Sequence, residues 1–197
     1  MTSGDDERRQ RFEGLVLPHL NAGLNLARWL THNDQDAQDV VQEAVLRAIR
    51  FMDSLRGADA RAWWLQIVRN TCFSWLKENR PAELAVLDDA DGVMHQIAAP
   101  AADEPPALAM RSAERLRINR AISALPVAYR EVLVLRELDD FSYQDIARIA
   151  GIPIGTVMSR LARARRLLQL ALQPGQRPVE RPADAEIPKP AQRGLTP

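Results

Sequence analysis

The chain has 197 residues, enough for one or two small domains that each bury a core. Its 26 basic and 26 acidic residues give a formal net charge of zero, so a nucleic-acid-binding surface would require local segregation of charge. The single cysteine, Cys72, excludes an internal disulfide, and the three histidines lack metal-ligand spacing, so we expect no metal and no other cofactor.

The apolar pattern predicts an all-α protein. Apolar residues recur at helical spacing, few segments alternate as strands do, and aromatic residues make up only 5% of the chain. No segment approaches the length of a membrane span, and the N-terminus lacks an apolar run. We therefore expect a cytoplasmic protein without membrane insertion.

The chain begins with a charged segment, residues 1–10, that we expect to be flexible, followed by an N-terminal domain over residues 11–80. Apolar residues at helical spacing extend from Phe12 to Leu30. Pro18 interrupts this stretch and can begin a second helix, because proline is tolerated in a first helical turn.

Asn33 or Asp34 can cap the next helix, whose apolar stripe runs almost uninterrupted from Ala37 to Met52. The opposite face carries the polar residues Asp36, Asp39, Gln42, Glu43 and Arg47. On these residues alone, a solvated face with a Glu43–Arg47 ion pair explains the pattern better than a binding surface does.

A loop around Gly57, with Asp59 as a helix cap, precedes a helix over residues 60–79 that carries three of the four tryptophans. Aromatic residues at helical spacing usually pack in a core, and we assign Trp63 to it. The same element is surrounded by the hydrogen-bond donors Arg56, Arg61, Arg69, Asn70 and Lys77. Aromatic and polar groups together can hold unpaired nucleic acid, although composition alone favours packing.

Residues 81–110 predict a flexible acidic linker. Helical periodicity disappears there, and acidic residues and prolines gather with Arg80 as the only nearby base. The acidity can keep the linker soluble, or it can let the linker occupy a basic channel that nucleic acid would otherwise fill.

Residues 111–172 predict a four-helix C-terminal domain, in which Leu125-Pro126 stops one helix and restarts the next. Its last two helices form a predicted helix-turn-helix, with Ser142 as the cap of the first and Gly151-Ile152-Pro153 forcing the turn. The tail, residues 173–197, is rich in proline and predicted to be disordered.

The second helix of this motif starts near Gly155-Thr156 and presents an apolar docking face formed by Val157, Leu161, Ala164 and Leu168. The outward arc is polar or small and carries four arginines and no acidic residue: Met158, Ser159, Arg160, Ala162, Arg163, Arg165 and Arg166. Such a helix fits the major groove of duplex DNA, and a solvated basic face is the alternative.

Four motifs follow one another in a fixed order: residues 36–43, the Trp63, Ile67 and Asn70 pattern, Leu125-Pro126, and the helix-turn-helix from Ser142 to Arg165. In this order and spacing the chain resembles the extracytoplasmic-function (ECF) group of sigma-70-type factors of bacterial RNA polymerase. The resemblance extends over about residues 12–172, with the linker unaligned.

The resemblance implies a transcription initiation factor without a catalytic site, with core RNA polymerase, promoter DNA and an anti-sigma factor as partners. It implies that Asp36, Asp39, Gln42, Glu43 and Arg47 contact the clamp helices of the largest polymerase subunit. It assigns Arg56, Arg61, Arg69, Asn70 and Lys77 to the unpaired minus-10 strand. Minus-35 duplex contacts are then implied for Arg136, Tyr143, Thr156, Met158, Ser159, Arg160, Ala162, Arg163, Arg165 and Arg166.

Two positions depart from the family pattern. Ser74 stands where an acidic residue is frequent, and Met158 stands where the recognition helix often has a basic residue. We therefore expect minus-35 recognition to depend on phosphate contacts and DNA shape. The alternative is a helix-turn-helix regulator that is not a sigma factor and binds duplex DNA without core enzyme. An enzyme is not expected, because the sequence lacks a nucleophile–base pair, metal-ligand spacing or a phosphate-binding loop.

Overall fold

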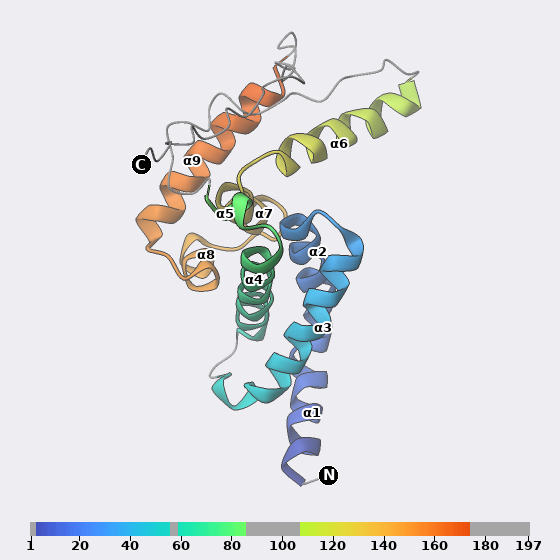
Figure 1. The fold of residues 1–197 in the computed structure, drawn as a ribbon, viewed down its shortest axis with the longest axis vertical. Coiled ribbons are helices and arrows are strands. Elements are labelled where there is room, and N and C mark those ends of the chain that lie inside the picture. The colour runs from blue at the N-terminus through green and yellow to red at the C-terminus, as the bar shows by residue number, and fades with distance from the viewer. Residues whose placement is uncertain (1–2, 56–58, 86–106, 174–197) are drawn as a thin grey trace, which may run out of the picture.

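The computed structural model describes residues 3–55, 59–85 and 107–173, and within these ranges all regular structure is helical (Figure 1). The all-α prediction is confirmed. The α-helices are α1 (Ser3–Leu15), α2 (Leu20–Thr31), α3 (Asp34–Arg50), α4 (Ala60–Asn79), α5 (Pro81–Ala85), α6 (Ala107–Ser123), α7 (Val127–Glu137), α8 (Tyr143–Ala150) and α9 (Ile154–Ala171). Short 3-10 helices cover Leu17–His19 and Met52–Ser54.

Several helices begin at the capping residues that the sequence predicts. The Asn33 side chain accepts hydrogen bonds from the backbone N–H groups of Gln35 and Asp36 at 2.7 and 3.1 Å. Asp59 caps α4 through the N–H of Ala62 at 3.0 Å, and Ser142 caps α8 through Asp145 at 3.1 Å. Each cap satisfies backbone donors that have no partner in the first helical turn.

The structure differs from two sequence expectations at the domain edges. Residues 3–10, expected to be flexible, belong to α1, where Arg8 pairs with Asp53 at 2.8 Å and Phe12 packs edge-on against Trp64. The helices α5 and α6 extend into the two ends of the predicted linker. The loop residue Gly57, the linker interior at 86–106 and the tail from residue 174 lie outside the described residues.

Helix α4 is the centre of the N-terminal domain and packs against α2 and α3. Trp64 is fully buried there, and its indole N–H donates to the backbone oxygen of His19 at 3.1 Å. Trp63, expected in the core, is only partly buried and donates to Ser54 Oγ at 3.2 Å. Trp64 is therefore the core residue and Trp63 lies at the edge of the core, because adjacent positions on a helix point about 100° apart.

Helix α7 joins the two halves of the molecule. It packs against α8 and α9 of its own domain and against α2 of the N-terminal domain, so most of its residues are buried. Helix α8 lies against α4, and Figure 1 shows α4 between α8 on one side and α2 and α3 on the other. Pro126 precedes α7 and stops α6 nearby, as predicted.

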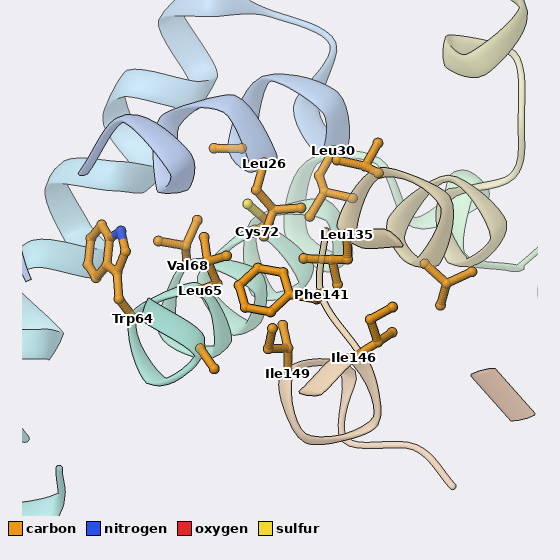
Figure 2. Packing of buried hydrophobic residues seen from close by; sticks show 14 of the residues in the cluster. Leu26, Leu30, Trp64, Leu65, Val68, Cys72, Leu135, Phe141, Ile146 and Ile149 are labelled. Carbon is orange, nitrogen blue, oxygen red and sulfur yellow. The ribbon is translucent and has the colours of Figure 1, made fainter. Parts of the chain in front are cut away.

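One apolar cluster continues from the N-terminal domain into the C-terminal domain. Figure 2 shows Leu65 and Val68 of α4 beside Phe141 and Ile149, which precede and belong to α8. The domains are therefore packed together in the free chain. No helix of the described residues has the length and apolar character that crossing a membrane requires.

Candidate protein and nucleic-acid interfaces

The polar face of α3 is solvent-accessible and carries all five residues predicted for protein binding. Glu43 and Arg47 form the expected ion pair at 2.8 Å, while Asp39 accepts a hydrogen bond from Gln35 at 3.3 Å. Asp36 is less exposed because it lies 3.5 Å from a guanidinium nitrogen of Arg80. Asp39, Gln42 and Glu43 are exposed. This face can meet a partner without rearrangement of the helix.

An apolar groove of about 520 Å³ lies beside this face, between α2 and α3. Its lining residues are Leu20, Asn21, Leu24, Val41, Gln42, Val45 and Leu46. Leu46, one of these lining residues, is 63% exposed. Sequence reasoning missed the groove, although Val41, Val45 and Leu46 widen the apolar stripe of α3 beyond the width that one neighbouring helix covers.

The donors predicted to hold unpaired DNA have different environments on α4. Asn70 and Lys77 are exposed, whereas Arg61 and Arg69 are partly buried against the C-terminal domain. Arg56 lies outside the described residues. The candidate single-strand surface is therefore only partly accessible in this arrangement.

A buried ion pair connects Arg69 to the C-terminal domain. Its Nε donates to Glu131 Oε1 at 2.6 Å, and the Glu131 side chain is fully buried while Arg69 is 17% exposed. Burial raises the pKa of Glu131, and the Arg69 guanidinium acts in the opposite direction. Arg69 also lies over the ring of Phe73, 3.8 Å from its centroid, and donates to Asn70 Oδ1 at 3.3 Å.

Two further polar contacts cross the same boundary. Arg61 Nη2 lies 3.2 Å from Asp139 Oδ1, and its guanidinium lies 4.4 Å from the centroid of Phe141. Burial raises the pKa of Asp139, opposed by the charge of Arg61. Arg148 reaches Asp59 at 3.0 Å. Sequence reasoning identified Arg61 and Arg69 but could not identify their carboxylate partners, which lie 78 and 62 residues away.

The helix-turn-helix has the geometry that its sequence predicts. Gly151 ends α8 with φ of 67°, a backbone conformation that glycine adopts without strain. Helix α9 starts at Ile154 and docks through Val157, Leu161 and Ala164. Leu167 is buried and Leu168 only partly so, which corrects the predicted end of the docking face by one residue.

The outward face of α9 is accessible, with Met158 54% exposed and Ser159, Ala162, Arg163 and Arg166 also exposed. Thr156 and Arg160 are partly buried, and the Ser159 hydroxyl donates to the backbone oxygen of Thr156 at 3.1 Å. Neither Arg163 nor Arg166 has an ion-pair partner among the described residues. Both are available to phosphate groups.

The other predicted minus-35 residues are held by the protein. Arg165 pairs with Glu137 at 2.6 Å. Arg136 donates to the backbone oxygen of Phe141 at 2.8 Å and lies 5.2 Å from the centroid of the Tyr143 ring. Arg136 therefore fixes the loop before α8, while Tyr143 stays partly exposed at the start of that helix.

No group of three or more His, Cys, Asp or Glu side chains in the described ranges is arranged to hold a metal ion. The surfaces consist of exposed charges, an apolar groove and a basic helix. Such surfaces bind macromolecules, with charge segregated to the places where each partner docks.

Comparison with known proteins identifies the two domains. Residues 15–81 match the family model Sigma-70 region 2, and residues 115–168 match Sigma-70, region 4. The RNA polymerase sigma-H factor of Pseudomonas aeruginosa is 35% identical over 170 residues, covering 84% of this chain and 88% of that protein. The ECF RNA polymerase sigma-E factor of Escherichia coli K12 is 38% identical over 148 residues, or 71% of this chain and 75% of that protein.

Solved structures show the same similarity. The sigma factor RpoE of Bartonella quintana, in complex with the anti-sigma factor NepR, aligns with a TM-score of 0.61 and 30% identity over 84% of this chain and 98% of that one. CnrH, in complex with the cytosolic domain of CnrY, aligns with a TM-score of 0.58 over 86% of this chain and 92% of that one. Its 23% identity supports the fold alone.

The match to region 2 argues against a regulator built only on a helix-turn-helix, because the whole N-terminal domain belongs to the same family as the C-terminal one. Sigma factors are not enzymes; they bind core RNA polymerase and promoter DNA. The chain belongs to the ECF group of the sigma-70 family and is an RNA polymerase sigma factor that initiates transcription.

Proposed function

We propose that this sigma factor uses three separate surfaces: the polar face of α3 with its groove for core RNA polymerase, α4 for the unpaired minus-10 strand, and α9 for the minus-35 duplex. The observation that carries this proposal is the apolar groove beside exposed Asp39 and Glu43. An apolar groove with a charged rim suits an amphipathic helical partner, whose apolar side chains fill the groove while basic ones meet the rim.

The assignment of α4 to the minus-10 strand is supported by its donors. Asn70 and Lys77 are exposed, and the guanidinium group of Arg69 lies over the ring of Phe73 on the same helix. Bases of a single strand can stack on such platforms while its phosphates pair with the cations.

The assignment of α9 to duplex DNA is supported by its outward face, which is exposed to solvent. Arg163 and Arg166 are exposed, and Met158 and Ala162 offer no hydrogen-bonding side-chain group to base edges. Specificity then comes from Ser159, from phosphate contacts that fix the register, and from DNA shape.

We further propose that the protein works in the cytoplasm and that an anti-sigma factor regulates it. The similar sigma factor RpoE was solved in complex with the anti-sigma factor NepR, and CnrH was solved in complex with the cytosolic domain of CnrY. In both complexes, the protein that aligns with this chain is the one to which the other protein is bound.

Charge reversal on α3 tests the division of labour. The double variant Asp39→Lys/Glu43→Lys should bind core RNA polymerase about tenfold more weakly or worse, since like charges then face the basic part of the partner. Its affinity for a minus-35 duplex should be unchanged. Fluorescence anisotropy with labelled sigma factor or labelled duplex measures both affinities.

The matched control is Glu7→Lys/Glu13→Lys, which makes the same charge change at exposed positions of α1. The proposal requires near-normal core binding for this control. Equal loss of core binding in both double variants would show that net charge rather than the α3 surface matters. Loss of duplex binding in the α3 variant would contradict the division of labour between α3 and α9.

A further inference from the structure

Met158 is the longest side chain on the outward face of the first two turns of α9. The other residues of this part of the face are Gly155, Ser159 and Ala162, all of them exposed. A Cβ atom added at Gly155 would meet no neighbouring atom of the described residues within 4 Å. In helix-turn-helix proteins the N-terminal residues of the second helix contact base edges in the major groove. Because its neighbours are short, Met158 reaches farthest towards those edges.

The polar groups near Met158 are engaged within the protein. The hydroxyl of Ser159 donates to the backbone oxygen of Thr156 at 3.1 Å, so its oxygen can accept a hydrogen bond while its proton is already in use. Arg160 is partly buried, and Arg165 is held by Glu137 at 2.6 Å. The start of α9 therefore presents an apolar side chain to the bases with few hydrogen-bond donors beside it.

The edges of the four bases differ in how they suit such a side chain. In the major groove, guanine, adenine and cytosine present hydrogen-bonding groups, whereas thymine also presents an apolar 5-methyl group. A thioether is at most a weak acceptor, so Met158 against a purine or a cytosine would displace water without replacing the lost hydrogen bonds. Against thymine, its exposed apolar surface would be buried on a methyl group. Thymine is therefore the base that this position favours.

The surroundings of Met158 suit the same contact. Ile154 lies one turn earlier on α9 and is also exposed, so the apolar surface continues to the start of the helix. Arg163 and Arg166 are exposed further along the helix and have no ion-pair partner among the described residues. Phosphate contacts from these two arginines would fix the register at which Met158 meets the base pairs.

On the basis of the duplex-binding role proposed for α9, we propose that Met158 is a specificity-determining residue that reads the 5-methyl group of a thymine in the minus-35 element. The short side chain of Ala162, one turn further on, leaves room for the methyl group. This contact adds a direct base readout to the readout through phosphates and DNA shape. The preferred minus-35 site therefore contains a T·A pair that faces Met158.

Removing a single methyl group from the DNA is the first test. The full chain bound to core RNA polymerase selects its preferred duplexes from a promoter library that is randomised in the minus-35 region. Each thymine of the selected site is then replaced by deoxyuridine, which lacks only the 5-methyl group. Affinity should fall about fourfold at the thymine that faces Met158, as expected for one buried methyl group. At the same position, 5-methylcytosine in a C·G pair should bind more tightly than cytosine.

Substitution of Met158 is the second test. Met158→Ala should bind the thymine site about fourfold more weakly or worse, and should no longer distinguish thymine from deoxyuridine at that position. Met158→Gln keeps the length of the side chain and should come to prefer adenine, whose N6 and N7 pair with an amide. Leu116→Ala on α6 is the matched control, because it truncates a similarly exposed apolar side chain and should keep the full sensitivity to deoxyuridine.

The outcomes separate the thymine contact from the proposed function. A selected site without thymine, equal affinity for thymine and deoxyuridine at every position, or a Met158→Ala protein that distinguishes them as wild type does would overturn the thymine contact and leave the sigma function standing. A library from which no minus-35 sequence is enriched would instead contradict the proposed role of α9, and the thymine contact with it.

Discussion

At the scale of single residues, Gly23 is required by the close approach of α2 to α4. A Cβ atom at this position would lie 2.5 Å from Trp64 Nε1 and 2.8 Å from Cε2 of the same ring. Gly23→Ala should therefore displace the indole, weaken its hydrogen bond to His19 and lower the free energy of unfolding by roughly 2 kcal/mol. Chemical denaturation monitored by tryptophan fluorescence measures the loss.

Gly14→Ala in α1 is the matched control, because no atom lies within 4 Å of its added Cβ. Its stability should stay equal to wild type or rise slightly, since alanine is the better helix former. Similar destabilisation by the two substitutions would mean that α2 and α4 are not this close.

Protonation of His32 makes the free energy of unfolding depend on pH. Desolvation, followed by repulsion from Arg130 and Arg80, lowers its pKa to about 4 from the ordinary 6.5. The folded chain therefore resists protonation of His32, and its contribution to stability is lost as pH falls from 6.5 towards 4. His32→Asn keeps a residue that tolerates the left-handed backbone at φ of 59° and removes the titrating group.

As pH decreases from 6.5 towards 4, the free energy of unfolding of the wild type should fall more than that of His32→Asn. Denaturation curves at several pH values supply the comparison. A difference that stays constant from pH 7 to 4 would contradict the assigned environment of His32.

Residues whose roles are local were predictable from sequence, and residues whose roles depend on packing were not. Asn33, Asp59 and Ser142 cap helices because a side-chain oxygen meets backbone N–H groups two or three residues ahead. The choice between Trp63 and Trp64 depended on where α2 and α1 lie against α4, which spacing along α4 alone does not specify.

At the scale of elements, α9 should bind DNA mainly through arginines that no carboxylate holds. Arg163→Ala should weaken binding to every duplex and reduce the slope of log affinity against log salt by about 0.9, the value for one lost phosphate contact. Salt titrations on a promoter duplex and an unrelated duplex test this. A loss confined to the promoter sequence would indicate a base contact instead.

The ion pair with Glu137 should hold Arg165 of α9 away from DNA phosphates and so lower the affinity for duplex DNA. Exposed pairs contribute about 1 kcal/mol or less, so freeing Arg165 by Glu137→Gln should raise duplex affinity by about twofold to fivefold. Glu114→Gln, an exposed change on α6, is the control for the altered net charge. Equal gains from both variants would assign the effect to long-range charge rather than to Arg165.

Element boundaries were largely predictable, while the surfaces between elements were not. The turn at Gly151 and the restart after Pro126 follow from backbone restrictions on single residues. The groove between α2 and α3 could not be located, because Leu24 and Val45 are equally consistent with a covered core when each helix is considered separately.

At the scale of the whole molecule, the sequence predicts two domains and leaves their arrangement open. Arg69 and Glu131 are 62 residues apart, and nothing near either residue indicates that they pair. The family match likewise identifies each domain without placing one against the other. Only the folded chain shows that an acidic side chain of one domain meets a cation proposed to bind DNA in the other.

Reconstituted transcription tests the central claim most directly. Purified chain and core RNA polymerase from the same bacterium are incubated with templates from its genome, and run-off transcripts are mapped. We expect discrete start sites that depend on this chain, with strong loss for Asp39→Lys/Glu43→Lys and near-normal yield for Glu7→Lys/Glu13→Lys. Absence of promoter-dependent transcripts on every template, from protein that is folded and binds core enzyme, would contradict the claim.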